Sequence, residues 1–269
     1  MDQSISVLEQ YELEIKGIRK GRGSLIISCK EGEFVLKEYS GSEEKASIQK
    51  KITERIAQNT DVLVQQIVCS KDGRLCVEEP DSARYILQTY MDGRECDIKD
   101  IKECVLAAKV MAKMHKEMYL EQGEDYKFPV SYSLKEEFCK RNNELRRIRR
   151  YLKEKKQKNE FERYVNKHFN YFFETALEVE KEWEVYEKYT VPENNTVQFC
   201  HGDFQHHNVW INSYREMMVL QFEKIMPDLP CRDLYLYMRK LLEKSNWDCN
   251  IGKSLLEAYE EERPLPFAE

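Results

Sequence analysis

An aspartate and an asparagine five residues apart are the residues of this sequence best suited to chemistry, and they lie in the stretch HGDFQHHN at residues 201–208. A carboxylate such as Asp203 can accept the proton of a hydroxyl group, and the amide oxygen of Asn208 can bind a divalent cation. Together with cations across the phosphates and good positioning, these functions are most of what phosphoryl transfer requires. Apolar runs at residues 197–199 and 209–211 flank the stretch, so we expect a tight loop between two strands.

The elements that must position this loop begin with strands. Four apolar or alternating runs in the first part of the chain predict an antiparallel sheet, at residues 25–29, 33–37, 75–77 and 85–87. Between the second and third runs, Ile48, Ile52 and Ile56 recur every four residues. This stripe predicts one amphipathic helix over residues 43–57.

The remainder of the chain has a mainly helical pattern. Apolar residues on one face predict a helix over residues 101–115, and a helical pattern with few breakers runs over residues 134–189. We expect aromatic side chains to form the buried side of this long stretch: Phe161, Tyr164, Phe169, Phe172 and Phe173. A short strand is expected at residues 218–220, followed by a final pair of helices.

Composition and charge exclude several classes of protein. The chain has 269 residues and a formal net charge of -6 at pH 7, which gives no general attraction to nucleic acid. Its nine cysteines are scattered, so we expect free, mostly buried thiols rather than a disulfide framework or a zinc site. No run is long and apolar enough for a membrane span, and the N-terminus does not read as a signal peptide, so synthesis in the cytoplasm is expected.

A basic run in the long helical stretch allows two interpretations. Arginines and lysines crowd the segment from Arg141 to Lys158, with few acids among them. They form either a solvated helix face or a dock for an anionic partner, such as a phosphorylated substrate or an acidic protein. No aromatic–basic recognition motif accompanies the run, so nucleic acid is not an expected partner.

Several short stretches carry a resemblance to a known family. HGDFQHHN resembles the catalytic loop of the aminoglycoside phosphotransferase and choline kinase superfamily. The stretch LQFEK at residues 220–224, followed by Arg232-Asp233-Leu234, is similar to that superfamily's metal-binding strand and the helix start after it. The FEK and RDLY forms, with the strand VLKEY at residues 35–39, resemble most closely the CotS-type spore coat branch.

This resemblance implies an α+β, two-lobed protein-kinase-like fold. Residues 1–91 would form a small antiparallel-sheet N-lobe, and residues 92–269 a mainly helical C-lobe. ATP and Mg²⁺ would be the cofactors, with a small molecule as acceptor. The nucleotide would bind between the lobes, where backbone groups of the hinge residues Gln88, Tyr90 and Met91 would meet an adenine ring.

The resemblance also implies roles for residues of the N-lobe. Lys37 matches the strand lysine that reaches the nucleotide phosphates. Its partner should be an acid on the next helix, and Glu44 is chosen, with Glu43 as the nearest alternative. Gly21 and Gly23 lie where a phosphate-covering loop would be, and they also suit an ordinary hairpin turn.

In the implied metal site, Asp203 would be the base and Asn208 the main metal ligand. The chain departs from the superfamily at Gln221, where an Asp that bridges metal ions is typical. A glutamine offers only a neutral oxygen, so metal and nucleotide binding should weaken together. Glu223 would share a face with Gln221 in a strand, and it is either a substitute ligand or a residue of minor structural role. Asp233 begins a helix, where an N-cap role would explain it.

Two functions therefore remain open. One is ATP-dependent phosphoryl transfer to a hydroxyl of a small molecule. The other is a catalytically degenerate kinase-fold protein, a pseudokinase, with a structural or interaction role among other spore coat proteins. Gln221 favours the second function, whereas Lys37, Asp203 and Asn208 favour the first.

Overall fold

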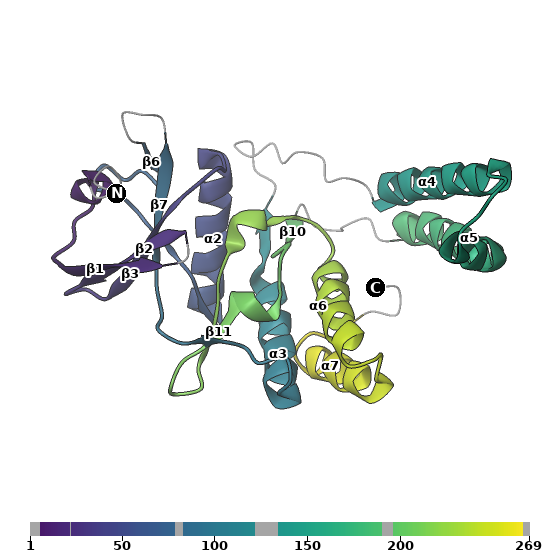
Figure 1. The fold of residues 1–269 in the computed structure, drawn as a ribbon. Helices are drawn as coiled ribbons and strands as arrows, with labels where there is room; N and C mark the ends of the chain where they lie inside the picture. The colour runs from purple at the N-terminus through teal and green to yellow at the C-terminus, as the bar shows by residue number, and fades with distance from the viewer. Residues whose placement is uncertain (1–5, 22, 79–82, 122–133, 190–195, 266–269) are drawn as a thin grey trace. The chain divides into compact units, whose positions relative to one another are not determined.

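The computed structural model of the chain describes residues 6–21, 23–78, 83–121, 134–189 and 196–265 (Figure 1). Contacts between Cα atoms divide the chain into two compact units, residues 1–121 with 197–267 and residues 122–196. The first unit holds an antiparallel sheet and four of the helices, and the second holds two long helices. The predicted boundary between an N-lobe and a C-lobe after residue 91 lies within the first unit and stays a prediction.

An antiparallel sheet forms the N-terminal part of the first unit (Figure 1). Its strands follow one another in the order β1 (Ile15–Gly21), β2 (Ser24–Cys29), β3 (Glu33–Glu38), β7 (Arg84–Thr89) and β5 (Ile67–Val68), and β6 (Val77–Glu78) also pairs with β7. The strands predicted at residues 25–29, 33–37 and 85–87 are confirmed, whereas the strand predicted at residues 75–77 begins only at Val77. β1 was not predicted because most of its side chains are exposed and no apolar alternation marks it. Arg22 lies outside the described residues.

Residues from the N-terminal turn cover one face of this sheet. η1 (Val7–Gln10) places Val7 and Leu8 in a buried cluster with Leu36 and Leu87. Leu36 lies directly opposite Leu87 in the ladder between β3 and β7. Full burial of an aliphatic side chain contributes about 1.5–3 kcal/mol, so this cluster fixes the register of the two strands.

The predicted helix over residues 43–57 is confirmed as α2 (Glu43–Asn59). The hydroxyl of Ser42 caps it by accepting a hydrogen bond from the backbone N–H of Lys45 at 3.1 Å. All three isoleucines of the predicted stripe are buried. α2 contacts β5 and the short strand β4 (Leu63–Val64), so the stripe anchors the helix within the first unit.

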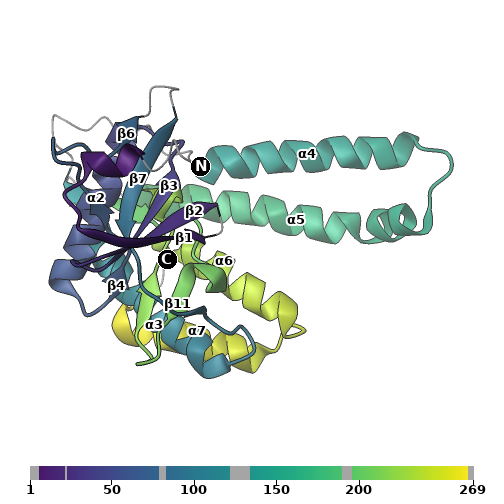
Figure 2. The same ribbon diagram turned by 60° about the vertical axis from the view of Figure 1, so that its left-hand side comes forward.

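Three further helices pack together in the first unit: α3 (Ile101–Glu117), α6 (Pro230–Lys244) and α7 (Cys249–Glu262) (Figure 2). Asp100 caps α3 by accepting from the backbone N–H of Lys102 at 2.9 Å. The buried hydroxyl of Tyr237 on α6 donates to the carbonyl of Cys104 on α3 at 3.0 Å. The helix predicted at residues 101–115 and the C-terminal helix pair are therefore confirmed.

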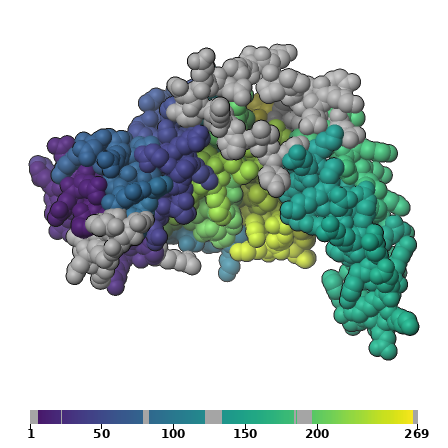
Figure 3. All heavy atoms as spheres, turned by 90° about the horizontal axis from the view of Figure 1, so that it is seen from above, coloured from purple at the N-terminus to yellow at the C-terminus, as the bar shows by residue number. Residues whose placement is uncertain are grey.

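Two small sheets carry the loop at residues 201–208. One is ordered β4, β12 (Met217–Val219), β11 (Val209–Ile211) and β8 (Arg94–Glu95), and the other β13 (Met226–Pro227), β10 (Thr196–Cys200) and β9 (Tyr119–Glu121). β10 leads into the loop and β11 leads out, so the predicted flanking strands are confirmed. α2 contacts η3 (Phe222–Lys224), and Figure 3 shows the blue-purple segment of α2 against this green part of the chain.

Two antiparallel helices make up the described part of the second unit, α4 (Leu134–Glu154) and α5 (Glu160–Tyr189) (Figure 2). The helical pattern over residues 134–189 is confirmed, with an interruption between the two helices. Asn159 and Glu162 form a capping box there. The N–H of Glu162 donates to Asn159 Oδ1 at 2.8 Å, and the N–H of Asn159 donates to Glu162 Oε2 at 2.9 Å. This pair defines where α5 begins.

The buried side of this helix pair contains only two of the five predicted aromatic residues. Phe169 and Phe173 are buried against α4. Phe161, Tyr164 and Phe172 are 74%, 64% and 63% exposed, so the prediction is wrong for them. Residues four apart share one face of a helix, and Tyr164 and Phe172 lie off the face that Phe169 and Phe173 define, whereas Phe161 lies in the first turn of α5.

The remaining composition-based expectations concern cysteines, membrane spans and the basic run. All nine cysteines are free, and five of them are buried. None of the described helices is long and apolar enough to cross a membrane. Within the basic run, Arg146 and Arg149 lie over the ring of Phe173 at 5.7 and 6.0 Å, so these two belong to the packing of α4 on α5. A docking role for the rest stays a prediction.

Candidate functional site

The loop at residues 201–208 closes on itself. The Nδ2 of Asn208 donates to the backbone carbonyl of Asp203 at 2.8 Å, which leaves the amide oxygen of Asn208 for another partner. Gly202 has a φ of 77°, in the left-handed region. A Cβ at this position would lie 2.3 Å from the carbonyl oxygen of Lys224. The predicted tight loop therefore brings Asp203 and Asn208 together, and only glycine fits at its start.

Asp233 holds the beginning of this loop. Its carboxylate is 1% exposed and accepts from the backbone N–H groups of His201 at 2.6 Å and Gly202 at 3.0 Å. It also lies 3.3 Å from Nε2 of His115, whose Nδ1 lies 2.7 Å from the hydroxyl of Tyr259. Burial opposes ionisation of Asp233, but the hydrogen bond with His115 and the charge and backbone contacts outweigh it, so the pKa of the carboxyl is lowered.

The predicted N-cap role of Asp233 is wrong. α6 begins at Pro230 with Leu229 as its N-cap residue, so Asp233 lies one turn inside the helix. Ligand atoms of Asp233, His115 and Cys200 lie within 4.8 Å of one another in the buried interior. Because the acid is already engaged by backbone N–H groups, we interpret this cluster as a brace for the loop.

Asp203 accepts two hydrogen bonds from side chains. Nζ of Lys224 lies 2.9 Å from its Oδ2, and Nε2 of Gln205 lies 2.6 Å from its Oδ1. Burial opposes ionisation, but these two donors outweigh it and lower the pKa of Asp203. The carboxylate is therefore ionised at neutral pH, as a base requires. It already has an ammonium partner, although the Lys224 side chain is 66% exposed and the pair is screened by solvent.

Lys37 reaches from β3 to the segment after β12. Its Nζ donates to Oε1 of Gln221 at 3.1 Å and forms an ion pair with Glu223. Gln221 has φ 65° and ψ 53°, a left-handed conformation that is uncommon for a glutamine. Its backbone N–H donates to Oε1 of Gln65 at 3.3 Å. The ammonium group of Lys37 thus contacts two other predicted site residues, Gln221 and Glu223.

The acid paired with Lys37 is Glu223 and not the predicted Glu44. Among the described residues no ion pair joins Lys37 to Glu44, which is exposed in the first turn of α2. Glu43 is also turned away and accepts from the backbone N–H of Leu75 at 3.1 Å. Glu223 lies in η3 rather than in the predicted strand, and this turn directs its carboxylate to Lys37.

Two hollows in the first unit meet at Lys37, Asn208 and Gln221. The first, which we call the polar hollow, has a volume of about 410 Å³, and its other charged lining residues are Glu38, Lys45, Asp203, Glu223 and Lys224. The second, the apolar hollow, has a volume of about 260 Å³, and its large apolar lining residues are Ile26, Val35, Tyr90, Trp210 and Leu220. The junction therefore joins an apolar space to a charged one.

The predicted hinge lies only partly beside these hollows. The ring of Tyr90 meets Trp210 edge to face at 5.8 Å between centroids, and the Arg19 guanidinium lies 5.3 Å from the Tyr90 centroid. Gln88 is fully buried in β7, and its amide atoms have no hydrogen-bond partner among the described residues. Neither Gln88 nor Met91 is among the described residues that line the two hollows.

Mg²⁺ does not fit the donor set of the polar hollow. This ion prefers anionic oxygens in near-octahedral geometry. The amide oxygen of Gln221 is neutral and accepts from Lys37, Glu223 is paired with Lys37, and Asp203 is paired with Lys224. Asp203 and Glu223 are therefore each already paired with an ammonium group, which leaves Glu38 as the remaining acid among the described residues that line the hollow.

Comparison with known proteins decides the family. The sequence matches the family model described as "Spore coat putative kinase YutH" over residues 4–269. The chain belongs to this family. No curated protein is significantly similar to it in sequence.

Solved structures show the fold of this family member. An aminoglycoside phosphotransferase from Alicyclobacillus acidocaldarius subsp. acidocaldarius DSM 446 has a TM-score of 0.81 at 16% identity, covering 98% of this chain and 79% of that chain. Amicoumacin kinase hAmiN, solved with AMP-PNP, Ca²⁺ and Ami, has a TM-score of 0.64 at 12% identity, covering 97% and 77%. A microcompartment-associated aminopropanol kinase has a TM-score of 0.61 at 13% identity, covering 98% and 81%. The predicted α+β protein-kinase-like fold and the predicted relation to CotS-type spore coat proteins are confirmed.

Three residues of the site in this family member escaped the sequence analysis: Lys224, Gln65 and Trp210. Gln65 joins the predicted hinge to Gln221, because its Nε2 donates to the carbonyl of Thr89 at 3.2 Å while its Oε1 accepts from the N–H of Gln221. No local pattern marks Gln65 or Trp210. Lys224 ends the LQFEK stretch, and its charge close to the predicted metal position was the one available signal.

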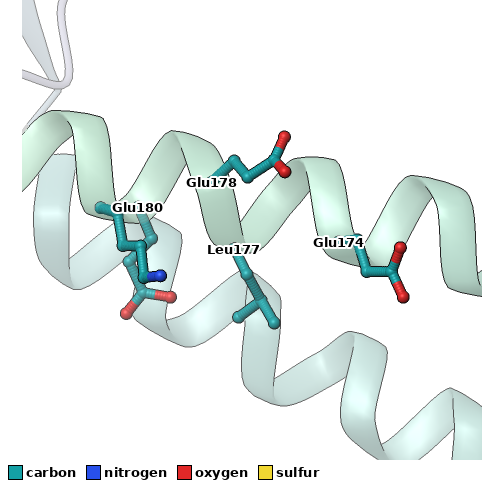
Figure 4. Close-up of a pocket in the computed structure, with 5 residues that line it drawn as sticks. Glu174, Leu177, Glu178 and Glu180 are labelled. Atoms are coloured by element: carbon teal, nitrogen blue, oxygen red, sulfur yellow. The ribbon is translucent and has the colours of Figure 1, made fainter.

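A further hollow lies along α5 in the second unit (Figure 4). It has a volume of about 390 Å³ and is lined by Glu174, Leu177, Glu178, Glu180 and Lys181. Leu177 points toward the neighbouring helix, whereas Glu178 points away from it. Glu180 accepts from Nδ2 of Asn142 at 2.6 Å, so it belongs to the packing of α4 on α5. We assign no chemistry to this hollow.

Replacement of Gly202 by alanine is expected to lower the free energy of unfolding by about 3 kcal/mol, because the new Cβ meets a backbone carbonyl in addition to the left-handed strain. Gly73→Ala is a matched control, since Gly73 has a φ of 76° and nothing within 4 Å of its Cβ position. The control should lose only about 1 kcal/mol. Chemical denaturation of both variants measures the difference, and equal losses would show that the contact with Lys224 does not constrain the loop.

Proposed function

We propose that the chain is a nucleotide-binding kinase-fold protein of the spore coat that has lost efficient phosphoryl transfer. The observation that carries this proposal is the contact of Lys37 with both Gln221 and Glu223 at the junction of the two hollows. It supports retention of the lysine that would reach nucleotide phosphates. It also supports loss of the metal-binding carboxylate, because the residue at that position is neutral and already bonded.

The two hollows support a nucleoside triphosphate as the ligand. The side chains of Tyr90 and Leu220 give the apolar hollow a surface suited to a purine ring, and the backbone at Gln88, Tyr90 and Met91 is proposed to meet the edge of that ring. The polar hollow, entered past Lys37, suits the phosphates. Amicoumacin kinase, which shares the fold, was solved with the ATP analogue AMP-PNP.

The loss of metal chemistry is supported by the charge pairing in the polar hollow. In this proposal the amide of Asn208 offers only a neutral oxygen, and Glu223 forms an ion pair with Lys37 instead of serving as a substitute metal ligand. Without a bridging carboxylate, an ATP–Mg²⁺ complex would lack a fixed ligand on the protein side. The expected role is then structural or interactive, with other spore coat proteins as partners and the spore coat as location, as the family description suggests.

The second candidate function is ATP-dependent phosphoryl transfer to a hydroxyl of a small molecule. One observation favours it: the carboxylate of Asp203 lines the polar hollow together with Asn208, and the pKa of Asp203 is lowered. In that case Asp203 would orient and deprotonate the acceptor hydroxyl, and Mg²⁺ would be held by Asn208 and Glu223. The aminoglycoside phosphotransferase and aminopropanol kinase among the solved structures act, by their names, on small molecules.

ATP is expected to raise the melting temperature of the wild-type protein, and Lys37→Met should remove most of this rise. A ligand at one hundred times its dissociation constant stabilises the folded state by about 2.7 kcal/mol, a shift of several degrees. Thermal shift should be recorded in MgCl₂ and in EDTA. Lys16→Met is the matched control, because Lys16 lies exposed on the same sheet, in β1.

The outcomes of this measurement separate the two candidates. An ATP-dependent shift without consumption of ATP supports the nucleotide-binding protein. A shift together with ATP consumption in the presence of a hydroxyl acceptor establishes the phosphotransferase instead. If ATP changes the melting temperature under neither condition, nucleotide binding is refuted.

A further inference from the structure

Ammonium groups lie beside the acids of the polar hollow that are the candidate ligands for a divalent cation. Nζ of Lys224 lies 2.9 Å from Asp203, and Lys37 is paired with Glu223. Lys45 lines the same hollow and adds a third ammonium. Three carboxylates line the same hollow, those of Glu38, Asp203 and Glu223, so the ammonium groups serve the phosphates of a nucleotide through a remaining N–H donor or where phosphate displaces a carboxylate.

We propose that this hollow binds the phosphates of a nucleoside polyphosphate without a divalent cation, with Lys37 and Lys224 as the counter-ions. The inference rests on the proposed nucleotide binding and specifies how that binding is achieved. It assigns Lys224 as a phosphate-binding residue. Because the donor set does not fit Mg²⁺, the two lysines take the place of the metal as counter-ions to the phosphates.

Lys37 is positioned for this role before any ligand arrives. Its side chain is only 13% exposed, and it is held by Gln221 at 3.1 Å and by Glu223. An ammonium has three N–H donors, so two contacts leave one donor for a phosphate oxygen. Gln221 contributes by its neutrality, since an aspartate here would repel phosphate unless a cation lay between them.

Lys224 can exchange one anion for another at little cost. Its ion pair with Asp203 is largely exposed on the lysine side, and exposed pairs contribute about 0–1 kcal/mol. A triphosphate carries more charge than one carboxylate and presents several acceptor oxygens, so it competes well for this ammonium. Asp203 keeps its hydrogen bond from Gln205 when Lys224 turns away.

Isothermal titration of the full chain with ATP, in EDTA and in MgCl₂, tests the inference. The dissociation constant of ATP in EDTA should equal that in MgCl₂ within about twofold, because the protein has no set of ligands that would stabilise bound Mg²⁺. Lys224→Met should weaken binding in EDTA by about fivefold, as expected for one partly exposed charge-assisted contact. Lys240→Met is the matched control, since Lys240 is exposed on α6 outside both hollows, and it should leave binding unchanged.

Each outcome of the titration has a defined meaning. Binding only in MgCl₂ overturns the metal-free mode but leaves nucleotide binding intact. Equal affinities of Lys224→Met and Lys240→Met overturn the assignment of Lys224. Absence of binding under both conditions refutes the proposed function itself and this inference with it. Because Lys224 is exposed, circular dichroism should show all three proteins equally folded.

Discussion

Asp233→Ala is expected to lower the free energy of unfolding by about 3 kcal/mol or more. The carboxylate is buried and satisfies the backbone N–H groups of His201 and Gly202 while facing His115. Alanine removes the acceptor and leaves these buried donors unpaired. In a chain of this length the melting temperature should fall by roughly 6–12 °C, measured by differential scanning calorimetry.

A second aspartate of the same fold provides the control for this change. Asp248 caps α7 by accepting from the N–H of Asn250 at 2.8 Å, and it is exposed. Asp248→Ala should cost about 1 kcal/mol, the usual loss of an N-cap. If Asp233→Ala costs no more than Asp248→Ala, the buried acid does not brace the loop that carries Asp203.

Gln221→Asp is expected to make nucleotide binding depend on magnesium. The new carboxylate would stand beside Glu223, and these two would provide the anionic oxygens that Mg²⁺ prefers, with the amide oxygen of Asn208 as a neutral ligand. ATP affinity should rise at least tenfold on addition of MgCl₂ and should fall in EDTA, where the added charge repels phosphate. Aspartate also tolerates the left-handed conformation at this position better than glutamine, so the variant should fold normally.

Gln58→Asp is the control for the change in net charge, because Gln58 is exposed near the end of α2 and outside both hollows. Isothermal titration of both variants measures the magnesium dependence. If Gln221→Asp binds ATP as the wild type does, with and without magnesium, then Gln221 does not occupy the position of a metal ligand. The comparison with kinase-like metal sites would then fail for this chain.

The sequence predicts those parts of the fold that local periodicity determines. Three isoleucines at intervals of four residues are enough to locate α2, and the spacing of Asp203 and Asn208 is enough to locate the loop. β1 leaves no such trace because its residues are mostly exposed. In α5 the exposed Phe161 and Phe172 show that apolar character alone does not identify the packed face.

The partners of the charged residues could not be predicted, and the physical reason is distance along the chain. Lys37 and Glu223 are brought together by the fold from opposite ends of the sequence, and the left-handed turn at Gln221 decides where Glu223 points. The choice of Glu44 followed from a family resemblance that carries no information on side-chain direction. Lys224 was overlooked for the same reason, because only the folded loop places its ammonium on Asp203.

In our proposal, this kinase-fold protein binds a nucleotide with lysines, and not a metal ion, as counter-ions to the phosphates. A crystal structure of the wild-type protein with ATP and EDTA tests this binding mode most directly. The expected result is an adenine ring in the apolar hollow and phosphate oxygens at about 3 Å from Nζ of Lys37 and Nζ of Lys224, with Gln221 still bonded to Lys37. An empty pair of hollows at saturating ATP would contradict the account. A bound nucleotide would also contradict it if Lys224 stayed paired with Asp203 and the phosphates became ordered only after a metal ion was supplied.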